Sequence, residues 1–175
     1  MSADFHLAVS RPMGVARELQ NEPIDESEVL SRVVVLTGEP ETLTTRNGAW
    51  CLLNAMRLLS RIVGRLRIVL PEGIGSLQND VRELASTLWS VDSVEVLMER
   101  ESNSETPAHA VLNVGTVVPG DSRWTTINSN GWLARVSSTP GRLDGNTALS
   151  NPLGAMAAAT LGVAEVFKRV YGIDA

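Results

Sequence analysis

The chain contains a short apolar run, Arg32–Thr37 (RVVVLT), in which polar and apolar residues do not alternate. A strand with one solvated face alternates between the two kinds of residue, whereas a strand covered on both faces does not, and such strands are typical of parallel sheets. Gly38 follows the run and marks its end. The pattern predicts a buried strand of an α/β sheet.

Similar runs recur along the chain and are separated by segments with helical spacing. A helix is predicted from Thr44 or Thr45 to about Val63, because apolar residues recur there at intervals of three and four. Strands that alternate with helices imply right-handed crossovers and a mainly parallel sheet. The further predicted strands are Leu66–Leu70, Val94–Met98 and Ala108–Val114, and the second helix is Gly75–Trp89.

Two β-rich segments near the carboxyl end flank the dipeptide Asn130-Gly131. Both residues adopt positive φ readily, so they predict a type I′ turn between antiparallel strands at Trp124–Asn128 and Trp132–Val136. A Gly/Pro/Ser-rich connection over residues 137–146 follows. The expected fold is α/β, a Rossmann-like doubly wound and mainly parallel sheet that an antiparallel hairpin extends.

The last predicted element is a long helix rich in alanine and glycine. Asn151 suits the N-cap, Pro152 the first turn and Gly172 the stop. Residues 1–30 form an N-terminal segment that is partly helical, with a short helix expected over Leu7–Leu19 and Pro12 near its first turn. Residues 31–175 then form one Rossmann-like domain.

Charge and composition exclude several classes of function. The net charge of -5 and the lack of any basic run argue against general nucleic-acid binding. A single cysteine, Cys51, forms no internal disulfide, and no signal peptide is visible. The longest apolar run, Ala155–Val166, is too short to span a bilayer. We expect a cytoplasmic protein that does not insert into membranes.

The loop after the first strand lacks the dinucleotide fingerprint, which needs three glycines in G-x-G-x-x-G. Only Gly38 is in place. The charge of Glu39 would repel phosphate, and Pro40 removes an amide donor. A normal phosphate-binding loop is not expected here.

Two further positions at strand ends give weak signals of a binding site. Glu72 follows the second strand, where Rossmann domains place an acidic residue for ribose hydroxyls, but without a glycine loop the favoured interpretation is a turn residue between Pro71 and Gly73. Asn113 closes the fourth strand, where an adenylating enzyme needs a carboxylate for magnesium. Its amide supplies no such charge, and a strand end leading into a turn is the simpler interpretation.

The remaining candidate residues indicate no catalytic or metal-binding site. Cys51 lies in a predicted helix and is interpreted as a buried structural thiol. His6 and His109 are the only histidines and form no zinc motif, so no metal is expected. Trp124 and Trp132 straddle the hairpin turn, where they either pack on the sheet or offer an aromatic edge to a protein partner.

Four segments together resemble the ThiF/MoeB/ubiquitin-activating-enzyme superfamily. More narrowly, they are similar to the N-terminal half of bacterial proteins that serve ubiquitin-like conjugation in antiphage defence, the Bil type included. The similarity covers residues 31–172, and the Asn-Pro-Leu-Gly helix is its most specific part. The segments are LSRVVVLTG, AVLNVGT, INSNGWLARVS and NPLGAMAAATLGVAEVFKRVYG.

The resemblance implies an inactive adenylation domain. Active members carry a glycine-rich ATP loop and two aspartates, and this chain departs from them at residues 38–40, 70–72 and 112–113. The resemblance implies that the chain has no catalytic residue and no cofactor of its own. Its partner would be the active adenylation domain of the same parent protein. A ubiquitin-like protein and a conjugating enzyme would be further partners of the complete protein.

The resemblance also implies a pairing surface. In the superfamily an N-terminal arginine of one half reaches the ATP of the other; Leu7 occupies that position in this chain, and Arg11 or Arg17 would have to substitute for it. The small-residue helix Leu153–Phe167 would pack against the partner. The predicted interface residues are Leu153, Met156, Ala157, Leu161, Trp132 and Arg11.

Two alternatives stay open. One is a divergent nucleotide-dependent adenylyltransferase or oxidoreductase that uses Glu72 and Asn113. The other is a freestanding protein-interaction module without an activating partner.

Overall fold

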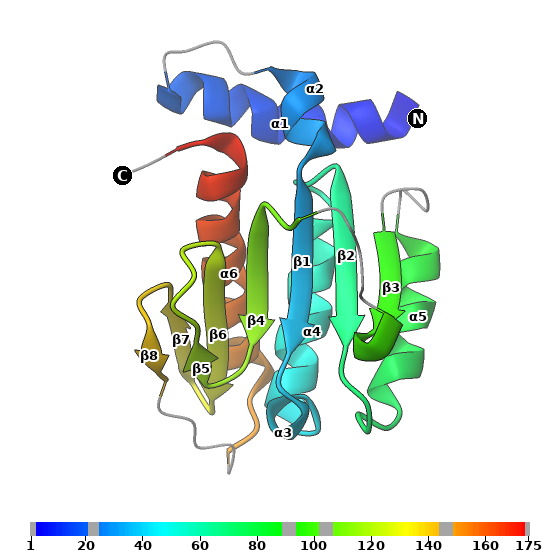
Figure 1. The fold of residues 1–175 in the computed structure, drawn as a ribbon, viewed down its shortest axis with the longest axis vertical. Coiled ribbons are helices and arrows are strands. Elements are labelled where there is room, and N and C mark those ends of the chain that lie inside the picture. Colours follow the sequence, from blue (N-terminus) through cyan, green and yellow to red (C-terminus); the bar gives the residue numbers. More distant parts are fainter. Residues whose placement is uncertain (1–2, 21–24, 89–93, 102–106, 144–148, 174–175) are drawn as a thin grey trace.

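A six-stranded sheet forms the centre of the protein, in the order β3-β2-β1-β4-β6-β7 (Figure 1). The computed structural model describes residues 3–20, 25–88, 94–101, 107–143 and 149–173. Neighbouring strands are parallel except β6 and β7, which form an antiparallel hairpin. The expected α/β class is therefore confirmed. The strands are β1 (Val33–Gly38), β2 (Arg65–Leu70), β3 (Val94–Met98), β4 (Ala110–Val114), β6 (Trp124–Asn130) and β7 (Leu133–Ser137).

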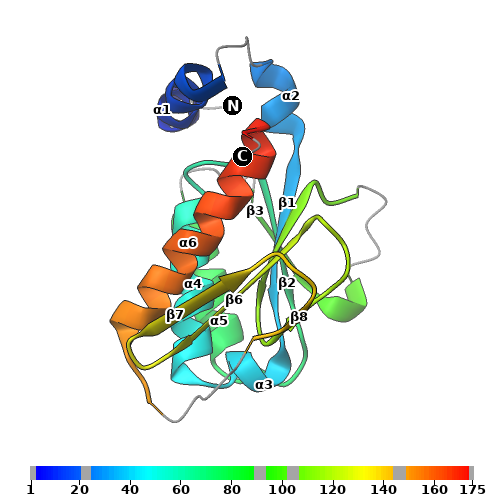
Figure 2. The ribbon, with the colours of Figure 1, turned by 90° about the vertical axis from the view of Figure 1, so that its left-hand side faces the viewer.

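Three helices cover one face of this sheet: α4 (Arg46–Leu59), α5 (Leu77–Thr87) and α6 (Pro152–Tyr171) (Figure 2). A small antiparallel ribbon of β5 (Val117–Val118) and β8 (Gly141–Arg142) lies on the other side. A doubly wound sheet usually carries helices on both faces, whereas α4, α5 and α6 all lie on one face here.

The amino ends of the strands carry the N-terminal helices α1 (Ala3–Gln20) and α2 (Glu26–Ser31) (Figure 1). At the opposite end, the short helix α3 (Pro40–Leu43) follows β1. Within the described residues, no helix combines the length and the apolar character needed to cross a membrane.

The first strand is buried unequally on its two faces. Val34 and Leu36 are fully buried beneath the helices, whereas Val35 and Thr37 on the other face are half-buried. That second face is partly polar. Next to Val35 in the register lies Arg67, whose guanidinium forms an ion pair with Glu95 at 2.8 Å.

The caps predicted for the last helix are confirmed. The side chain of Asn151 accepts a hydrogen bond from the amide of Leu153, and Pro152 occupies the first turn. Gly172 ends the helix with a left-handed φ of 68°. The helix lies close to the sheet at Gly162, where a Cβ would stand 2.4 Å from a methyl carbon of Ile127.

Several helix boundaries differ from the sequence prediction, among them the start of α5 at Leu77 and not Gly75. α1 begins at Ala3, not Leu7, so Pro12 lies inside the helix and not in its first turn. α4 ends at Leu59, where the chain tightens into a turn, although Val63 beyond it is still buried. The predicted end of the second helix, Trp89, lies outside the described residues.

The hairpin turn is displaced by one residue. Asn130 pairs with Leu133, so the two-residue loop consists of Gly131 and Trp132 and not of Asn130 and Gly131. Gly131 supplies the positive φ, 56°, that the turn requires. The connection expected at residues 137–146 contains strand β8, which the sequence did not predict, and its last residues lie outside the described part.

Candidate functional site

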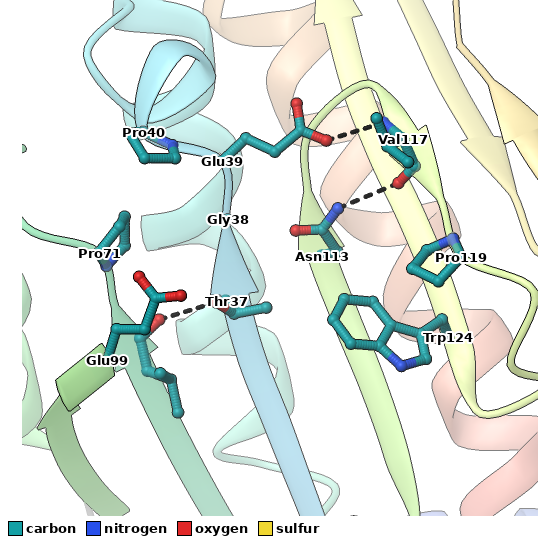
Figure 3. A pocket seen from close by; sticks show the side chains of 11 residues that line it. Thr37, Gly38, Glu39, Pro40, Pro71, Glu99, Asn113, Val117, Pro119 and Trp124 are labelled. Carbon is teal, nitrogen blue, oxygen red and sulfur yellow. Dashed lines mark hydrogen bonds between the residues drawn. The ribbon is translucent and has the colours of Figure 1, made fainter. Parts of the chain in front are cut away.

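A cavity of about 280 Å³ opens at the carboxyl ends of β1, β2 and β4 (Figure 3). In the strand order, β1 and β4 flank the point where the direction of winding reverses. Open α/β sheets bind their ligands at this switch point. The cavity is lined by Thr37, Gly38, Glu39, Pro40, Val69, Pro71, Glu99, Asn113, Val117, Pro119 and Trp124.

The carboxylate of Glu39 dominates the polar contacts of this site. One of its oxygens accepts hydrogen bonds from the amide and the hydroxyl of Thr116, at 2.9 and 3.0 Å. The other accepts one from the amide of Val117 at 2.8 Å. Successive backbone amides that converge in this way form an anion-binding nest. Here the anion that fills it is a side chain of the protein itself.

The loop from Gly115 to Val117 fits closely around Glu39. A Cβ on Gly115 would stand 2.5 Å from the Glu39 carboxyl carbon, so glycine is needed for this approach. The amide of Glu39 in turn donates to the carbonyl of Val114 at 2.9 Å. Glu39 thereby joins the ends of β1 and β4 through both its backbone and its side chain.

The helix that follows β1 offers no free cradle for a phosphate. Pro40 begins α3 and contributes no amide hydrogen. The next helix, α4, is capped by its own Thr45, whose hydroxyl accepts from the amide of Gly48 at 3.0 Å. Gly38 is packed against Leu43, which a Cβ at that position would meet at 2.8 Å. The glycine serves the packing of β1 on α3.

Asn113 is almost fully buried at the end of β4, with 5% of its surface exposed. Its amide nitrogen donates to the carbonyl of Val117 at 3.3 Å and to the hydroxyl of Thr126 at 3.4 Å. In Figure 3 the amide oxygen points away from Val117, toward β1. The side chain thus holds the loop after β4 in place.

The remaining walls of the cavity are apolar or acidic. Trp124 and Pro119 line one side, and Pro71 with Glu99 lines the other (Figure 3). Among the described residues that line the cavity there are two carboxylates and no lysine or arginine. A nucleotide phosphate would meet a negative potential here.

Glu72 lies apart from the cavity. Its side chain is 66% exposed and forms an ion pair with Arg100 at 3.5 Å. Of the positions singled out in the sequence, the structure therefore brings together Gly38, Glu39, Pro40 and Asn113, but not Glu72.

The residues predicted for the interface fall into two separate places. Trp132 is 75% exposed in the hairpin turn, and the predicted residues of α6 are also exposed: Leu153 at 53%, Met156 at 49%, Leu161 at 48%, and Ala157. Arg11 is exposed on α1, which lies at the opposite end of the sheet (Figure 1). The structure does not bring Arg11 near the others.

Cys51 is a buried thiol, as expected. It is fully buried and lies 3.6 Å from the hydroxyl of Ser129. Burial raises the pKa of the thiol to about 11, although the contact with Ser129 opposes the rise. Nor do the described residues bring three His, Cys, Asp or Glu side chains together in a group suited to a metal ion.

Sequence reasoning missed the polar junction around Asn47, which is 1% exposed at the start of α4. Its amide nitrogen donates to the carbonyl of Leu149 at 2.7 Å, and its oxygen accepts from the amide of Asn151 at 3.0 Å. A weaker contact reaches the carbonyl of Ser129. The junction joins α4, the hairpin and the start of α6. The sequence shows only an asparagine in the first turn of a predicted helix, which does not reveal these contacts.

Comparison with known proteins identifies the family of the chain. The family model of the BilD N-terminal domain matches residues 32–175, which includes every strand of the sheet and the whole cavity. A search of curated proteins found no match. The family name is that of a Bil-type component, in agreement with the narrower resemblance seen in the sequence. The chain therefore belongs to the family of BilD N-terminal domains.

Proposed function

We propose that this chain is the non-catalytic adenylation half of a Bil-type activating-enzyme-like protein. It pairs with an active, ATP-dependent adenylation domain of the same parent protein and supports ubiquitin-like protein conjugation in antiphage defence. Its own contribution is binding: a rigid surface that holds the active half's ATP site in its working geometry. The ubiquitin-like protein and the conjugating enzyme act on the complete protein.

One observation carries the non-catalytic part of the proposal. The switch-point cavity has its converging amide donors at Thr116 and Val117, and both donate to the carboxylate of Glu39. A nucleotide would have to displace a covalently tethered anion from these amides, and no basic side chain lines the cavity among the described residues to compensate for its phosphates.

The alternative of a divergent nucleotide enzyme that uses Glu72 and Asn113 lacks such support. The two side chains do not share a site, because Glu72 pairs with Arg100 outside the cavity. Asn113 holds a loop with its amide nitrogen and carries no charge for a magnesium ion.

Calorimetric titration with ATP and magnesium tests the non-catalytic role. We expect no heat of binding at micromolar to millimolar nucleotide for this chain. Binding in the micromolar range would overturn the proposal in favour of the divergent enzyme.

The supporting role needs a second measurement. The active adenylation domain is assayed for ATP–pyrophosphate exchange in the presence of the ubiquitin-like protein, whose terminal carboxylate accepts the adenylyl group, with and without this chain. We expect exchange to rise when the chain is present. If the two proteins do not associate and exchange is unchanged, the chain is a freestanding interaction module instead.

A further inference from the structure

The outer sides of α4 and α6 present an unusual surface for a helix layer. The two helices pack side by side behind the sheet (Figures 1 and 2). Their outward-facing residues, here called the α4–α6 face, are Arg46, Trp50, Leu53, Arg57 and Arg61 at α4 and Leu153, Met156, Ala157, Thr160, Leu161 and Ala164 on α6.

The centre of this face is apolar. Leu153, Met156 and Leu161 are each about half exposed, at 53%, 49% and 48%, and Trp50 and Leu53 on the adjacent helix α4 are half-buried. Exposed apolar groups that gather on one side of a soluble protein mark interaction sites.

The neighbouring helix shows that the apolar character is local. The exposed residues of α5 are all polar: Asn79, Asp80, Arg82, Glu83, Ser86 and Thr87. α5 covers the same face of the sheet, so it shows what a solvated helix looks like in this protein (Figure 2).

The exposed side of the middle of α6 also carries small side chains. Ala157, Thr160 and Ala164 recur at spacings of three and four and are exposed. Small side chains along one stripe allow the backbone of a partner to approach closely. Larger side chains, Met156 and Leu161, border the stripe on either side by helical geometry.

The border of the face is basic. Arg46, Arg57 and Arg61 are exposed, and among the described residues no carboxylate lies within ion-pair distance of them. The carboxylate on α6, that of Glu165, is neutralised by Lys168 at 2.8 Å. The whole chain has a net charge of -5, so this positively charged border is opposite in sign to the net charge of the chain.

The charges decide between two occupants. A second copy of the chain, docked with two-fold symmetry, would present the same basic border to itself, and like charges at an interface are costly. A partner with carboxylates around an apolar centre would instead pair with the three arginines and steer toward them.

We propose that the α4–α6 face binds a protein partner whose apolar contact patch is bordered by Asp and Glu. The identity of that partner rests on the proposed function, which makes it the active adenylation domain. The chemistry of the contact rests on the α4–α6 face alone.

Site-specific photocrosslinking in the native cell tests where the partner sits. p-Benzoylphenylalanine replaces Leu53 or Ala157 in the full protein, and Ser86 on α5 serves as the matched control. We expect crosslinks from the first two positions to a partner segment that mass spectrometry shows to be apolar and flanked by acidic residues. Crosslinks to a second copy of this chain, crosslinks to nucleic acid, or equal yields from Ser86 would each overturn the proposal.

A charge-reversal experiment tests the arginines. The double variant Arg57→Glu/Arg61→Glu is expected to weaken binding of the crosslinked partner about tenfold or more at low salt. The loss should shrink at about 500 mM salt, where surface charges are screened. Arg82→Glu on α5 is the control and should leave binding unchanged. Lysine in place of the partner's nearest acidic residues should restore binding to the double variant. An unchanged affinity in the double variant would reject the charge pairing.

The two proposals fail in different ways. If the active adenylation domain crosslinks from Ser86 and not from the α4–α6 face, the proposed function stands and this inference fails. If the α4–α6 face crosslinks to an acidic-bordered protein with no adenylation domain, this inference stands and the proposed function fails.

Discussion

Glu39 and Thr116 are joined by two hydrogen bonds, from the amide and the hydroxyl of Thr116 to one carboxylate oxygen, at 2.9 and 3.0 Å. The two residues lie 77 positions apart in the sequence, at the ends of β1 and β4. From the sequence, the negative charge of Glu39 was expected only to repel a phosphate. In the structure, the Glu39 carboxylate also occupies the backbone amides that an incoming anion would need.

Replacing Glu39 by alanine should destabilise the protein by about 1–3 kcal/mol, because it removes charge-assisted bonds to partly buried donors. Urea unfolding measures the change. Glu41→Ala is the matched control, since Glu41 is exposed on the following helix and should change stability by less than about 0.5 kcal/mol. Equal effects from the two variants would show that the bonds of Glu39 contribute nothing to stability.

Asn47→Ala should cost about 2–4 kcal/mol. It leaves the part-buried amide of Asn151 without its partner, at a cost of about 1–3 kcal/mol, and it removes one of the two hydrogen bonds to the carbonyl of Leu149, which still accepts from the amide of Gly131, at a cost of about 0.5–1.5 kcal/mol. The midpoint of denaturant unfolding should fall while its slope stays constant. Asn54→Ala is the control, because Asn54 bonds only to the carbonyl of Trp50 in its own helix. A loss for Asn47→Ala no greater than for Asn54→Ala would contradict the role of the junction.

Gly154→Ala should be strongly destabilising, by about 2 kcal/mol or more, because overpacking against a fixed backbone forces a shift. A Cβ on Gly154 would lie 2.1 Å from the carbonyl oxygen of Gly131, so the hairpin turn would have to leave the start of α6. Gly14→Ala in α1 is the matched control. Nothing stands within 4 Å of its Cβ position, and the change should stabilise the helix by about 0.5–1 kcal/mol. Thermal unfolding of the two variants in parallel checks the opposite signs.

The sequence predicted more of the sheet than of the loops. Each strand of the sheet was located to within about two residues, because apolar runs mark the first four strands and the Asn130-Gly131 turn signal marks β6 and β7. The hairpin turn was misplaced by one residue, since turn propensity favours Asn130-Gly131 while the pairing of Asn130 with Leu133 decides the register.

The sequence likewise revealed only part of the candidate site. Gly38, Glu39, Pro40 and Asn113 line one cavity, because the carboxyl ends of parallel strands share one edge of the sheet. Glu72 does not line it, and its side chain forms an ion pair with Arg100. Neither the bonds of Glu39 nor the junction at Asn47 leaves a local pattern, since both join segments more than about seventy residues apart.

The burial of Cys51 predicts a loss of stability at alkaline pH. The pKa of its thiol is raised to about 11 in the folded protein, from 9.0 for a free thiol. The unfolded chain therefore releases the thiol proton first as the pH rises, and it then binds fewer protons than the folded chain. Stability should be unaffected below about pH 8 and should fall between pH 9 and 11, by up to about 1.4 kcal/mol per pH unit.

Cys51→Ala isolates this contribution. Burial also raises the pKa of Tyr171, which adds its own pH dependence to the unfolding free energy. Both proteins keep this tyrosine, so its contribution cancels in the difference between them. The difference in unfolding free energy between the two proteins should be constant from pH 6 to 8 and should narrow between pH 9 and 11, as only the wild type loses the thiol contribution. A difference that stays constant across pH 9–11 would mean that the folded protein admits solvent to the thiol. Labelling with a thiol reagent at pH 8 would then be fast in the native state, where we expect it to require unfolding.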